Sequence, residues 1–301
     1  MRWLYWLRLL WNLPHLSRIS PKPLSLLGEA MREPIRYPLH LREGQNRFCE
    51  ISLPNLYGLL QLRQIGLMPA PHQPDDPTWL RWQLSPQGTF LTRLSPGMDL
   101  MHLYELFVRK DYGEDFSDRV VLDIGAYNGD SAVYFALKGA KRIIALEPYP
   151  PSYQLAQQNI HSMGLADRIT LLPVGLGVQV GKATMRVATQ QPGANTVYGI
   201  GSALQKMLTF EREVEIELLP FSALLEKFGL EEVDFVKLDC EGCEFAVIQA
   251  LSLEELRRAK VWHIEYHASP TPLIQKLKSA GYEVKKQRDR GILGYLVAQQ
   301  R

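Results

Sequence analysis

The sequence predicts an α/β fold with a mainly parallel seven-stranded sheet that ends in an antiparallel hairpin. From about residue 99 onward, β-rich runs alternate with helical runs, and most of the β-rich runs are almost continuously apolar. Strands of this kind are covered on both faces, as they are in parallel sheets. The last two expected strands are separated only by Asp289–Gly291, and so short a connection requires antiparallel pairing.

The individual elements follow in order from the same patterns. The expected strands of the sheet are short β-rich runs, at 119–126, 142–148, 168–177, 233–240, 261–267, about 282–288 and 291–298. A further alternating run lies at 214–220. The expected helices are at 130–139, 151–164, 221–229, about 242–258 and 271–282. The glycine-spotted stretch 183–206 is expected to be an irregular insertion rather than a unit of the core.

The first 92 residues are expected to form a Pro/Trp-rich extension that precedes a larger domain at 93–301. Twelve of the 20 prolines and five of the six tryptophans lie before residue 100. Prolines this frequent disfavour long helices between about 20 and 98. Within that region we expect a loop at 69–77 and a hairpin at 81–94, whose turn is formed by Ser85–Gly88.

The segment 1–18 is aromatic and basic, and two interpretations of it are open. Its apolar run ends at Pro14, short of the roughly 20 residues that a membrane-spanning helix needs. The segment either forms a short helix that packs on its own protein or lies on a membrane surface with its arginines near anionic headgroups. We therefore expect a cytoplasmic protein with a possible peripheral membrane contact through this segment.

The composition excludes several classes of protein. With 46% hydrophobic and 22% charged residues, the 301-residue chain can bury a core, unlike disordered or collagen-like proteins. Its net charge of +2 does not indicate a nucleic-acid partner. Three cysteines are too few for a disulfide framework, so a reducing compartment is expected. The pair Cys240-x-x-Cys243 lacks the second ligand pair of a zinc site, and we expect both to be small packing residues.

The first strand–helix junction, Asp123–Ser131, predicts a cofactor-binding loop. Gly125 and Gly129 let the backbone approach a ligand closely, and one of the last two residues of the loop is expected to cap the helix. A dinucleotide-binding loop would carry glycines where Tyr127 and Asp130 stand. Asp130 would repel a pyrophosphate but attract the sulfonium or ammonium group of S-adenosylmethionine. The predicted cofactor contacts in this loop are Asp123, Gly125, Ala126, Tyr127, Asn128, Gly129 and Asp130.

A second acidic residue supports the same cofactor. Glu147 closes the second expected strand, where a carboxylate can accept hydrogen bonds from both ribose hydroxyls of an adenosine cofactor. The adjacent Pro148 is included in the predicted site. The loop, this carboxylate and the closing hairpin together favour S-adenosylmethionine over a nicotinamide cofactor.

Four stretches of the chain resemble the FkbM-type S-adenosylmethionine-dependent methyltransferases, over roughly residues 93–301. They are VVLDIGAYNGDS (120–131), ALEPYPPSYQLAQQNI (145–160), VKLDCEGCE (236–244) and HIEYH (263–267). This resemblance implies a class I (Rossmann-like) methyltransferase fold and methyl transfer, mostly to oxygen on sugars, polyketides or similar natural products. Many class I enzymes place an Asp after the third strand to meet adenine. Because this chain has Pro173–Gly177 there, backbone groups near Val174 are expected to make that contact.

The ends of the fourth and fifth expected strands carry the candidate catalytic residues. O-methylation requires an acceptor oxygen in line with the methyl–sulfur bond and a group that removes its proton. We expect Asp239 to position the acceptor and also to contact the cofactor. Either Glu241 or His267 is expected to remove the proton. Lys237 lies on the same side of its strand as Asp239, so the two can pair. Two further carboxylates cluster at these strand ends, Glu244 and Glu265.

Other functions stay open as alternatives. The carboxylates with His263 and His267 could also ligate a divalent ion, but we predict no metal site. A NAD(P)-dependent oxidoreductase and a non-catalytic S-adenosylmethionine-binding module are the alternative functions. A nucleic-acid methyltransferase would need an aromatic Pro-Pro motif after the fourth strand to hold an extruded base, and this chain has Asp-Cys-Glu-Gly there. The expected partner is therefore a small-molecule or glycan acceptor.

Overall fold

The computed structural model of the protein describes residues 35–40, 46–189, 193–199 and 208–301. The expected helix or membrane segment at 1–18 lies outside these residues. The chain divides into two compact units: residues 1–113 with 161–164, and residues 114–160 with 165–301. The expected boundary between residues 92 and 93 stays a prediction. Among the described helices, none is both long and apolar enough to span a bilayer.

The first unit contains two described helices and two small antiparallel sheets. The helices are α4 (Leu53–Gln64) and α5 (Asp99–Phe107). One sheet pairs β1 (Ile35–His40) with β2 (Asn46–Ile51), and the other has the order β3 (Met68–Pro69), β4 (Trp79–Gln83), β5 (Thr89–Arg93). The hairpin expected at 81–94 is confirmed as β4–β5.

Helix α4 contradicts the expectation that prolines exclude long helices from this region. It has 12 residues, and its only proline, Pro54, lies in the first turn. A proline is tolerated there because the amide it lacks would have no partner within the helix. Buried Asn55 of this helix hydrogen-bonds to the chain after β5. Its Nδ2 donates to the Leu94 carbonyl at 2.9 Å, and its Oδ1 accepts from the Leu100 amide at 2.8 Å.

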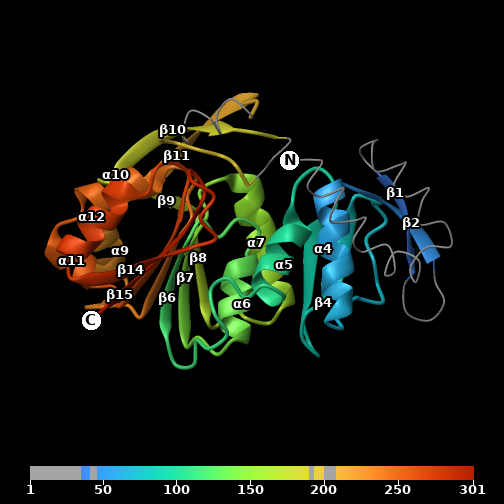
Figure 1. The fold of residues 1–301 in the computed structure, drawn as a ribbon. Coiled ribbons are helices and arrows are strands. Elements are labelled where there is room, and N and C mark those ends of the chain that lie inside the picture. The colour runs from blue at the N-terminus through green and yellow to red at the C-terminus, as the bar shows by residue number, and fades with distance from the viewer. Residues whose placement is uncertain (1–34, 41–45, 190–192, 200–207) are drawn as a thin grey trace. The chain divides into compact units, whose positions relative to one another are not determined.

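The second unit is built on the predicted seven-stranded sheet (Figure 1). Its strand order is β14-β15-β13-β12-β6-β7-β8; the pairs β14–β15 and β15–β13 are antiparallel, and the other four pairs are parallel. The closing hairpin is therefore confirmed. The strand bounds are β6 (Val120–Ile124), β7 (Arg142–Leu146), β8 (Ile169–Leu172), β12 (Phe235–Leu238), β13 (Val261–Tyr266), β14 (Tyr282–Gln287) and β15 (Gly294–Gln300).

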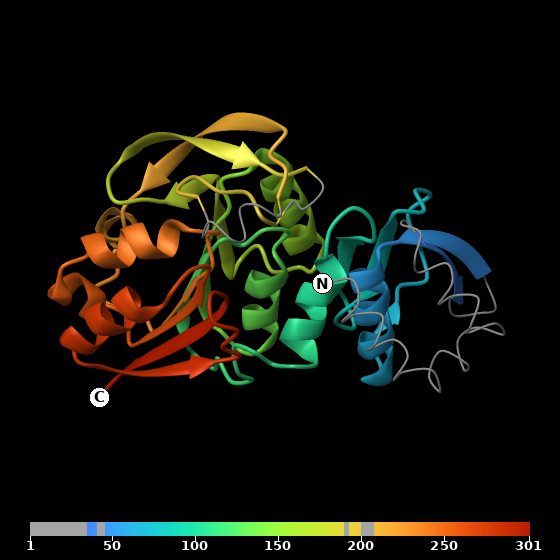
Figure 2. The same cartoon turned by 45° about the horizontal axis from the view of Figure 1, so that its top comes forward.

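Helices cover both faces of this sheet (Figures 1 and 2). Val236 of β12 joins a core with residues of α9, α10 and α12, whereas the neighbouring Phe235 contacts Phe135 of α6, with ring centroids 5.6 Å apart. Because successive strand residues face opposite sides, these contacts place α6 on the other face. The helix bounds are α6 (Asp130–Leu137), α7 (Pro150–Ser162), α9 (Phe221–Lys227), α10 (Cys243–Ala250), α11 (Leu253–Arg257) and α12 (Thr271–Ser279).

Two expected elements are each divided in the structure. The helix expected at 242–258 is α10 followed by α11, because Ser252 and Glu255 form a capping box that starts a new helix. The strand expected at 168–177 is broken at Pro173, which has no amide to donate to the sheet. Only β8 stays in the seven-stranded sheet, and the residues after Pro173 belong to a different sheet.

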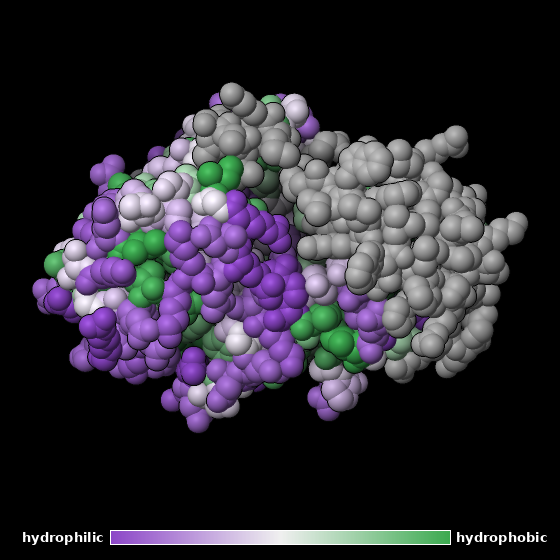
Figure 3. Space-filling view, in the orientation of Figure 1, coloured by the Kyte–Doolittle hydropathy of each residue, from purple (hydrophilic) through white to green (hydrophobic). Residues whose placement is uncertain are grey.

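That second sheet of the unit has three strands, in the order β10 (Gly181–Val187), β11 (Arg212–Leu219) and β9 (Val174–Leu176). The stretch 183–206 was expected to be irregular, yet its first residues belong to β10. The reason is an alternation that buries Met185 and Val187 against Ile216 and Leu218 of β11. On the face shown in Figure 3, hydrophilic residues cover most of the described surface and apolar residues form small groups.

Candidate active site

The loop after β6 is shaped by two glycines. Gly125 has φ +84°, and a Cβ there would lie 1.8 Å from the carbonyl oxygen of Asp239, so a side chain would collide with the backbone after β12. Gly129 has φ +86° and is the N-cap of α6, which begins at Asp130. The expectation that Asp130 or Ser131 caps the helix is wrong, because the left-handed turn before α6 favours glycine at the cap.

The amides of this loop are already hydrogen-bonded within the protein. The Tyr127 amide donates to Oε2 of Glu147 at 2.8 Å, and the Asp130 amide donates to Oδ1 of Asn128 at 3.2 Å. The Ser131 amide donates to Oδ1 of Asp130 at 2.6 Å. A pyrophosphate binds at a helix N-terminus through amides of this kind. These three amides already have acceptors within the protein, which a pyrophosphate would have to displace.

Glu147 directly follows β7 and is 7% exposed. Its Oε1 accepts from the Tyr149 amide at 2.9 Å, and its Oε2 accepts from the Tyr127 amide. Burial raises the pKa of Glu147 to about 7, against the effect of both amides and of Lys237. Each carboxylate oxygen has a second lone pair, so the pair can accept two hydroxyl donors. Such acceptors, together with buried Asp130, fit a ligand that presents ribose hydroxyls and a positive charge.

Buried Lys237 connects the cofactor loop to the strand beside it. Its Nζ lies 3.3 Å from Oδ1 of Asp123 and 3.4 Å from Oδ2 of Asp239, and it donates to the Gly125 carbonyl at 2.7 Å. Burial lowers the pKa of Lys237, but the two carboxylates outweigh it and raise the pKa above its ordinary value. The expected Lys237–Asp239 pair is thus confirmed. Asp123 also accepts from the Ser131 hydroxyl at 2.7 Å, which places it underneath the loop.

Val174 and Pro148 lie at the edge of the same region. Val174 starts β9 and is buried, and Pro148 directly follows Glu147. A Cβ on Gly175, which follows Val174, would lie 3.6 Å from Cγ of Pro148. The chain after β7 and the chain after β8 therefore meet beside Glu147.

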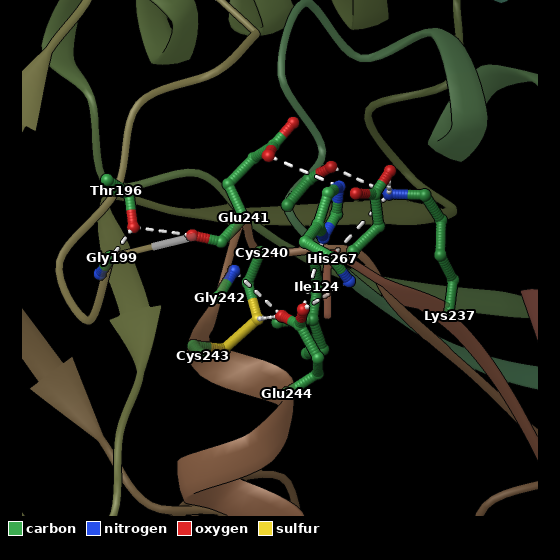
Figure 4. The surroundings of a disulfide bond; sticks show 12 residues. Ile124, Thr196, Gly199, Lys237, Cys240, Glu241, Gly242, Cys243, Glu244 and His267 are labelled. Carbon is green, nitrogen blue, oxygen red and sulfur yellow. Dashed lines mark hydrogen bonds and ion pairs between the residues drawn. A yellow bond between two sulfur atoms is a disulfide. The ribbon is translucent and has the colours of Figure 1, made fainter. Parts of the chain in front are cut away.

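His267 follows β13 and is held between two carboxylates (Figure 4). Its Nε2 lies 3.2 Å from Oε2 of Glu241, and its Nδ1 lies 3.1 Å from Oε1 of Glu244. Burial lowers the pKa of His267, but these carboxylates and that of Glu265 raise it well above its ordinary value. Glu244 is fully buried in the first turn of α10, and its Oε2 accepts from the Gly242 amide at 2.8 Å. The sequence grouped Glu244 with the carboxylates that are candidate bases at this strand end.

Cys240 and Cys243 form a disulfide, with 5.4 Å between their Cα atoms. The expectation that they are separate small packing residues is wrong. The turn between them has Glu241 at φ +53° and Gly242 at φ +110°, and this left-handed geometry brings the two cysteines together. Cys49 is buried and is not part of this disulfide.

The carboxyl ends of β12 and β13 also bring together three groups able to ligate a cation. Among the described residues, ligand atoms of Asp239, Glu265 and His267 lie within 4.8 Å of one another. Lys237 already places a positive charge beside Asp239, and we assign no ion there. His263 lies apart from this group: it is buried on β13, with its ring centroid 5.2 Å from that of Tyr295.

A cavity of about 360 Å³ lies against His267 and Glu244. Part of its wall comes from a segment that the sequence did not connect to the site. The Thr196 hydroxyl donates to the Glu241 carbonyl, and the Gly199 amide donates to the Thr196 hydroxyl at 2.9 Å (Figure 4). The lining residues are Tyr198, Gly199, Gly242, Glu244, Phe245, Ala246, His267 and Ala268.

Comparison with known proteins gives the family. Residues 123–284, more than half of the chain, match the family model described as Methyltransferase FkbM domain. Methyltransferase sdnD from Sordaria araneosa is 25% identical over 198 residues, covering 57% of this chain and 76% of sdnD. The 2-O-methyltransferase NoeI from Sinorhizobium fredii is 25% identical over 158 residues, covering 50% of this chain and 63% of NoeI.

Other similar proteins are much longer or more distant. The AMB antimetabolite synthetase AmbE from Pseudomonas aeruginosa is 22% identical over 272 residues, which cover 75% of this chain and 12% of AmbE. This chain thus spans a small part of AmbE and just under two thirds of NoeI. A crystal structure of Methyltransferase FkbM from Methylobacillus flagellatus has a TM-score of 0.43 at 18% identity, covering 64% of this chain and 47% of that one.

Proposed function

The chain belongs to the FkbM methyltransferase family, with S-adenosylmethionine as its cofactor, and we propose that it methylates a hydroxyl group of a sugar, glycan or other natural product. The observation that carries this proposal is the meeting of two half-sites at the carboxyl edge of one sheet. Glu147 and the glycine loop belong to the donor half, and the Glu241–His267 pair belongs to the acceptor half. Lys237 contacts both halves.

In the donor half, the residues present fit S-adenosylmethionine. When bound, the cofactor supplies a methyl group activated by a positively charged sulfur. Glu147 would accept from the ribose hydroxyls, and Asp130 would attract the positively charged end. Backbone near Val174 and the side chain of Pro148 would line the adenine. The internally bonded loop amides argue against the alternative NAD(P) function, because a pyrophosphate would have to displace their present acceptors.

In the acceptor half, the Glu241–His267 pair would take the proton of the hydroxyl, on the Glu241 carboxylate while His267 is protonated and on His267 once it is neutral. His267 lines the cavity, and the Glu241 side chain is 21% exposed, so both members of the pair are accessible. Glu244 would hold the ring through Nδ1 and thereby fix its orientation. Asp239, 25% exposed, would position the acceptor hydroxyl. The aromatic rings of Tyr198 and Phe245 in the cavity wall suit the apolar faces of a sugar or polyketide ring.

The proposal is tested by transfer of a labelled methyl group from S-adenosylmethionine to glycan and lipid extracts. Once an acceptor is identified, Asp239→Asn, Glu241→Gln and His267→Asn are compared with Glu283→Gln, an exposed control on β14. Loss of a general base typically lowers the rate by about 10²–10⁴-fold. We expect Glu241→Gln or His267→Asn to fall by that order while titration shows unchanged cofactor binding. If all three variants stay within about threefold of the natural chain, the assignment of the base is wrong and positioning alone carries the reaction.

Titration also separates the alternative functions. Binding of S-adenosylmethionine without binding of NADH supports a methyltransferase, and the reverse would overturn the proposal in favour of an oxidoreductase. A protein that binds S-adenosylmethionine yet methylates no acceptor in any extract would support the non-catalytic binding module.

A further inference from the structure

We propose that Cys240 and Cys243 are a thiol–disulfide site, and that its redox state controls the Glu241–His267 pair. The reacting partner is a dithiol reductant or the corresponding disulfide oxidant. The effect on turnover rests on the proposed function, whereas the thiol chemistry and its effect on His267 do not. Three observations support this proposal: the place of the disulfide in the loop, its contact with Glu244, and the different burial of its two cysteines.

The disulfide encloses the turn that presents Glu241. Glu241 and Gly242 lie between the two cysteines and both have positive φ, +53° and +110°. Such a conformation is unfavourable for a glutamate and persists only where its surroundings hold it. The disulfide closes the turn from both ends, and the Thr196 hydroxyl holds the Glu241 carbonyl. Reduction removes the covalent restraint and leaves the turn held by non-covalent contacts such as this hydrogen bond.

Glu244 connects the sulfur atoms to the histidine (Figure 4). Sγ of Cys240 lies 3.6 Å from Oε2 of Glu244, while Oε1 of the same carboxylate binds Nδ1 of His267 at 3.1 Å. A disulfide sulfur carries no hydrogen, so in the oxidised protein this contact has no donor. A thiol at Cys240 would donate its S–H to Oε2. Reduction therefore adds a donor to the fully buried carboxylate that orients His267.

The two cysteines differ in a way that favours one direction of exchange. Cys240 is partly exposed, whereas Cys243 is 4% exposed and is the first residue of α10. A reductant thiolate would attack Sγ of Cys240 and break the S–S bond. Cys243 would leave as a thiolate, which the N-terminus of α10 stabilises.

The second thiol of the reductant then completes the exchange. It displaces Cys240 from the mixed disulfide and closes the reductant into its own disulfide. Two electrons and two protons pass from the reductant to the cysteine pair, and the reverse reaction restores the protein disulfide.

The experiment equilibrates the folded protein with oxidised or reduced dithiothreitol and traps thiols with N-ethylmaleimide. Tryptic cleavage after Lys237 and Arg257 places both cysteines in one peptide, separate from Cys49. We expect two adducts on that peptide after reduction, none after oxidation, and full reversal. A pair that stays disulfide-bonded or stays reduced under both conditions would overturn the proposal.

The effect on the site is measured by NMR of the His267 imidazole at constant pH, with His267→Asn used to assign its signal. We expect a different imidazole shift in the two redox states. Once an acceptor is known, turnover should be roughly three- to tenfold lower in the reduced protein, the range set by one competing hydrogen bond. Affinity for S-adenosylmethionine should stay within about twofold. Reversible labelling with unchanged imidazole shifts and unchanged turnover would overturn the proposal.

Two double variants distinguish the loss of the disulfide restraint from the gain of a hydrogen-bond donor to Glu244. Cys240→Ser with Cys243→Ser lacks the disulfide but keeps a donor to Glu244, whereas Cys240→Ala with Cys243→Ala lacks both. We expect neither to respond to dithiothreitol, and the serine pair to show the lower turnover and the reduced-like imidazole shift. Identical behaviour of the two variants would refute the role of Glu244. If no extract is methylated but the imidazole shift follows the redox state, the proposed function fails and this proposal stands.

Discussion

Affinity for S-adenosylmethionine should fall about tenfold between pH 8 and pH 6, because of the protonation of Glu147. Burial raises the pKa of this carboxyl to about 7, and the nearby Asp123 carboxylate adds to the rise. The amides of Tyr149 and Tyr127 and the charge of Lys237 act in the opposite direction. Ribose hydroxyls donate to the carboxylate, so the cofactor prefers the deprotonated form. Below pH 7, binding must first remove a proton.

The size of the effect follows from the pKa alone. With a pKa of about 7, roughly nine tenths of the free protein carries the carboxylate at pH 8 and roughly one tenth at pH 6. The ratio corresponds to about 1.4 kcal/mol of binding free energy. The same rise in pKa affects protein stability in the opposite direction: stability falls as pH rises, whereas affinity for the cofactor increases. Because the folded protein holds this proton more tightly than the unfolded chain, Glu147 lowers the free energy of unfolding as pH rises from 4.5 towards 7.

The assay is isothermal titration at pH 6, 7 and 8, for the natural chain and for Glu147→Gln. The variant should bind more weakly at pH 8, by about 1.5–3 kcal/mol, the range for hydrogen bonds to a charged group. Its affinity should also lose the tenfold dependence on pH. The α-amino group of the cofactor titrates near pH 8 in both proteins, so the difference between them isolates Glu147. Equal pH dependence in the two proteins, or equal affinity at pH 8, would remove Glu147 from the ribose site.

Three further predictions concern stability and the N-terminal segment. In urea titrations, Lys237→Met should lower the free energy of unfolding by about 3–5 kcal/mol, because it leaves the buried Asp123 carboxylate without its cation, whereas Lys260→Met, in exposed ion pairs, should cost much less. Gly125→Ala should destabilise the fold far more than Gly281→Ala: both have positive φ, but only the first Cβ meets backbone, so similar losses would refute the collision. A chain that starts near residue 20 should keep its cofactor affinity and lose any binding to anionic vesicles; if the full chain ignores such vesicles at low salt, the membrane interpretation fails.

The sequence predicted the parts of the fold that depend on local pattern. Apolar strand runs and the short connection at Asp289–Gly291 are enough to indicate a parallel sheet with a closing hairpin, since both features act over a few residues. The sheet of β9, β10 and β11 could not be predicted, because its pairing depends on which distant strand is available once Pro173 ends β8. Helix α4 shows that counting prolines misleads unless their position in a turn is considered.

The site divides in the same way. Lys237 and Asp239 lie two residues apart on one strand, so their pairing follows from strand geometry. The link from Thr196 to the Glu241 carbonyl joins segments 45 residues apart, and no local pattern indicates it. The disulfide depends on positive φ at two consecutive residues, and only the glycine at 242 signals that in the sequence.

The position of Lys237 has a thermodynamic consequence for the order of events in the site. One ammonium group serves the loop carbonyl of Gly125 on the donor side and the carboxylate of Asp239 on the acceptor side. Any ligand that draws this ammonium towards one partner changes the free energy of the other. By linkage, the donor then alters acceptor affinity by the same factor by which the acceptor alters donor affinity. A donor and an acceptor that each shift this ammonium would therefore change each other's affinity through Lys237, in addition to any direct contact between them.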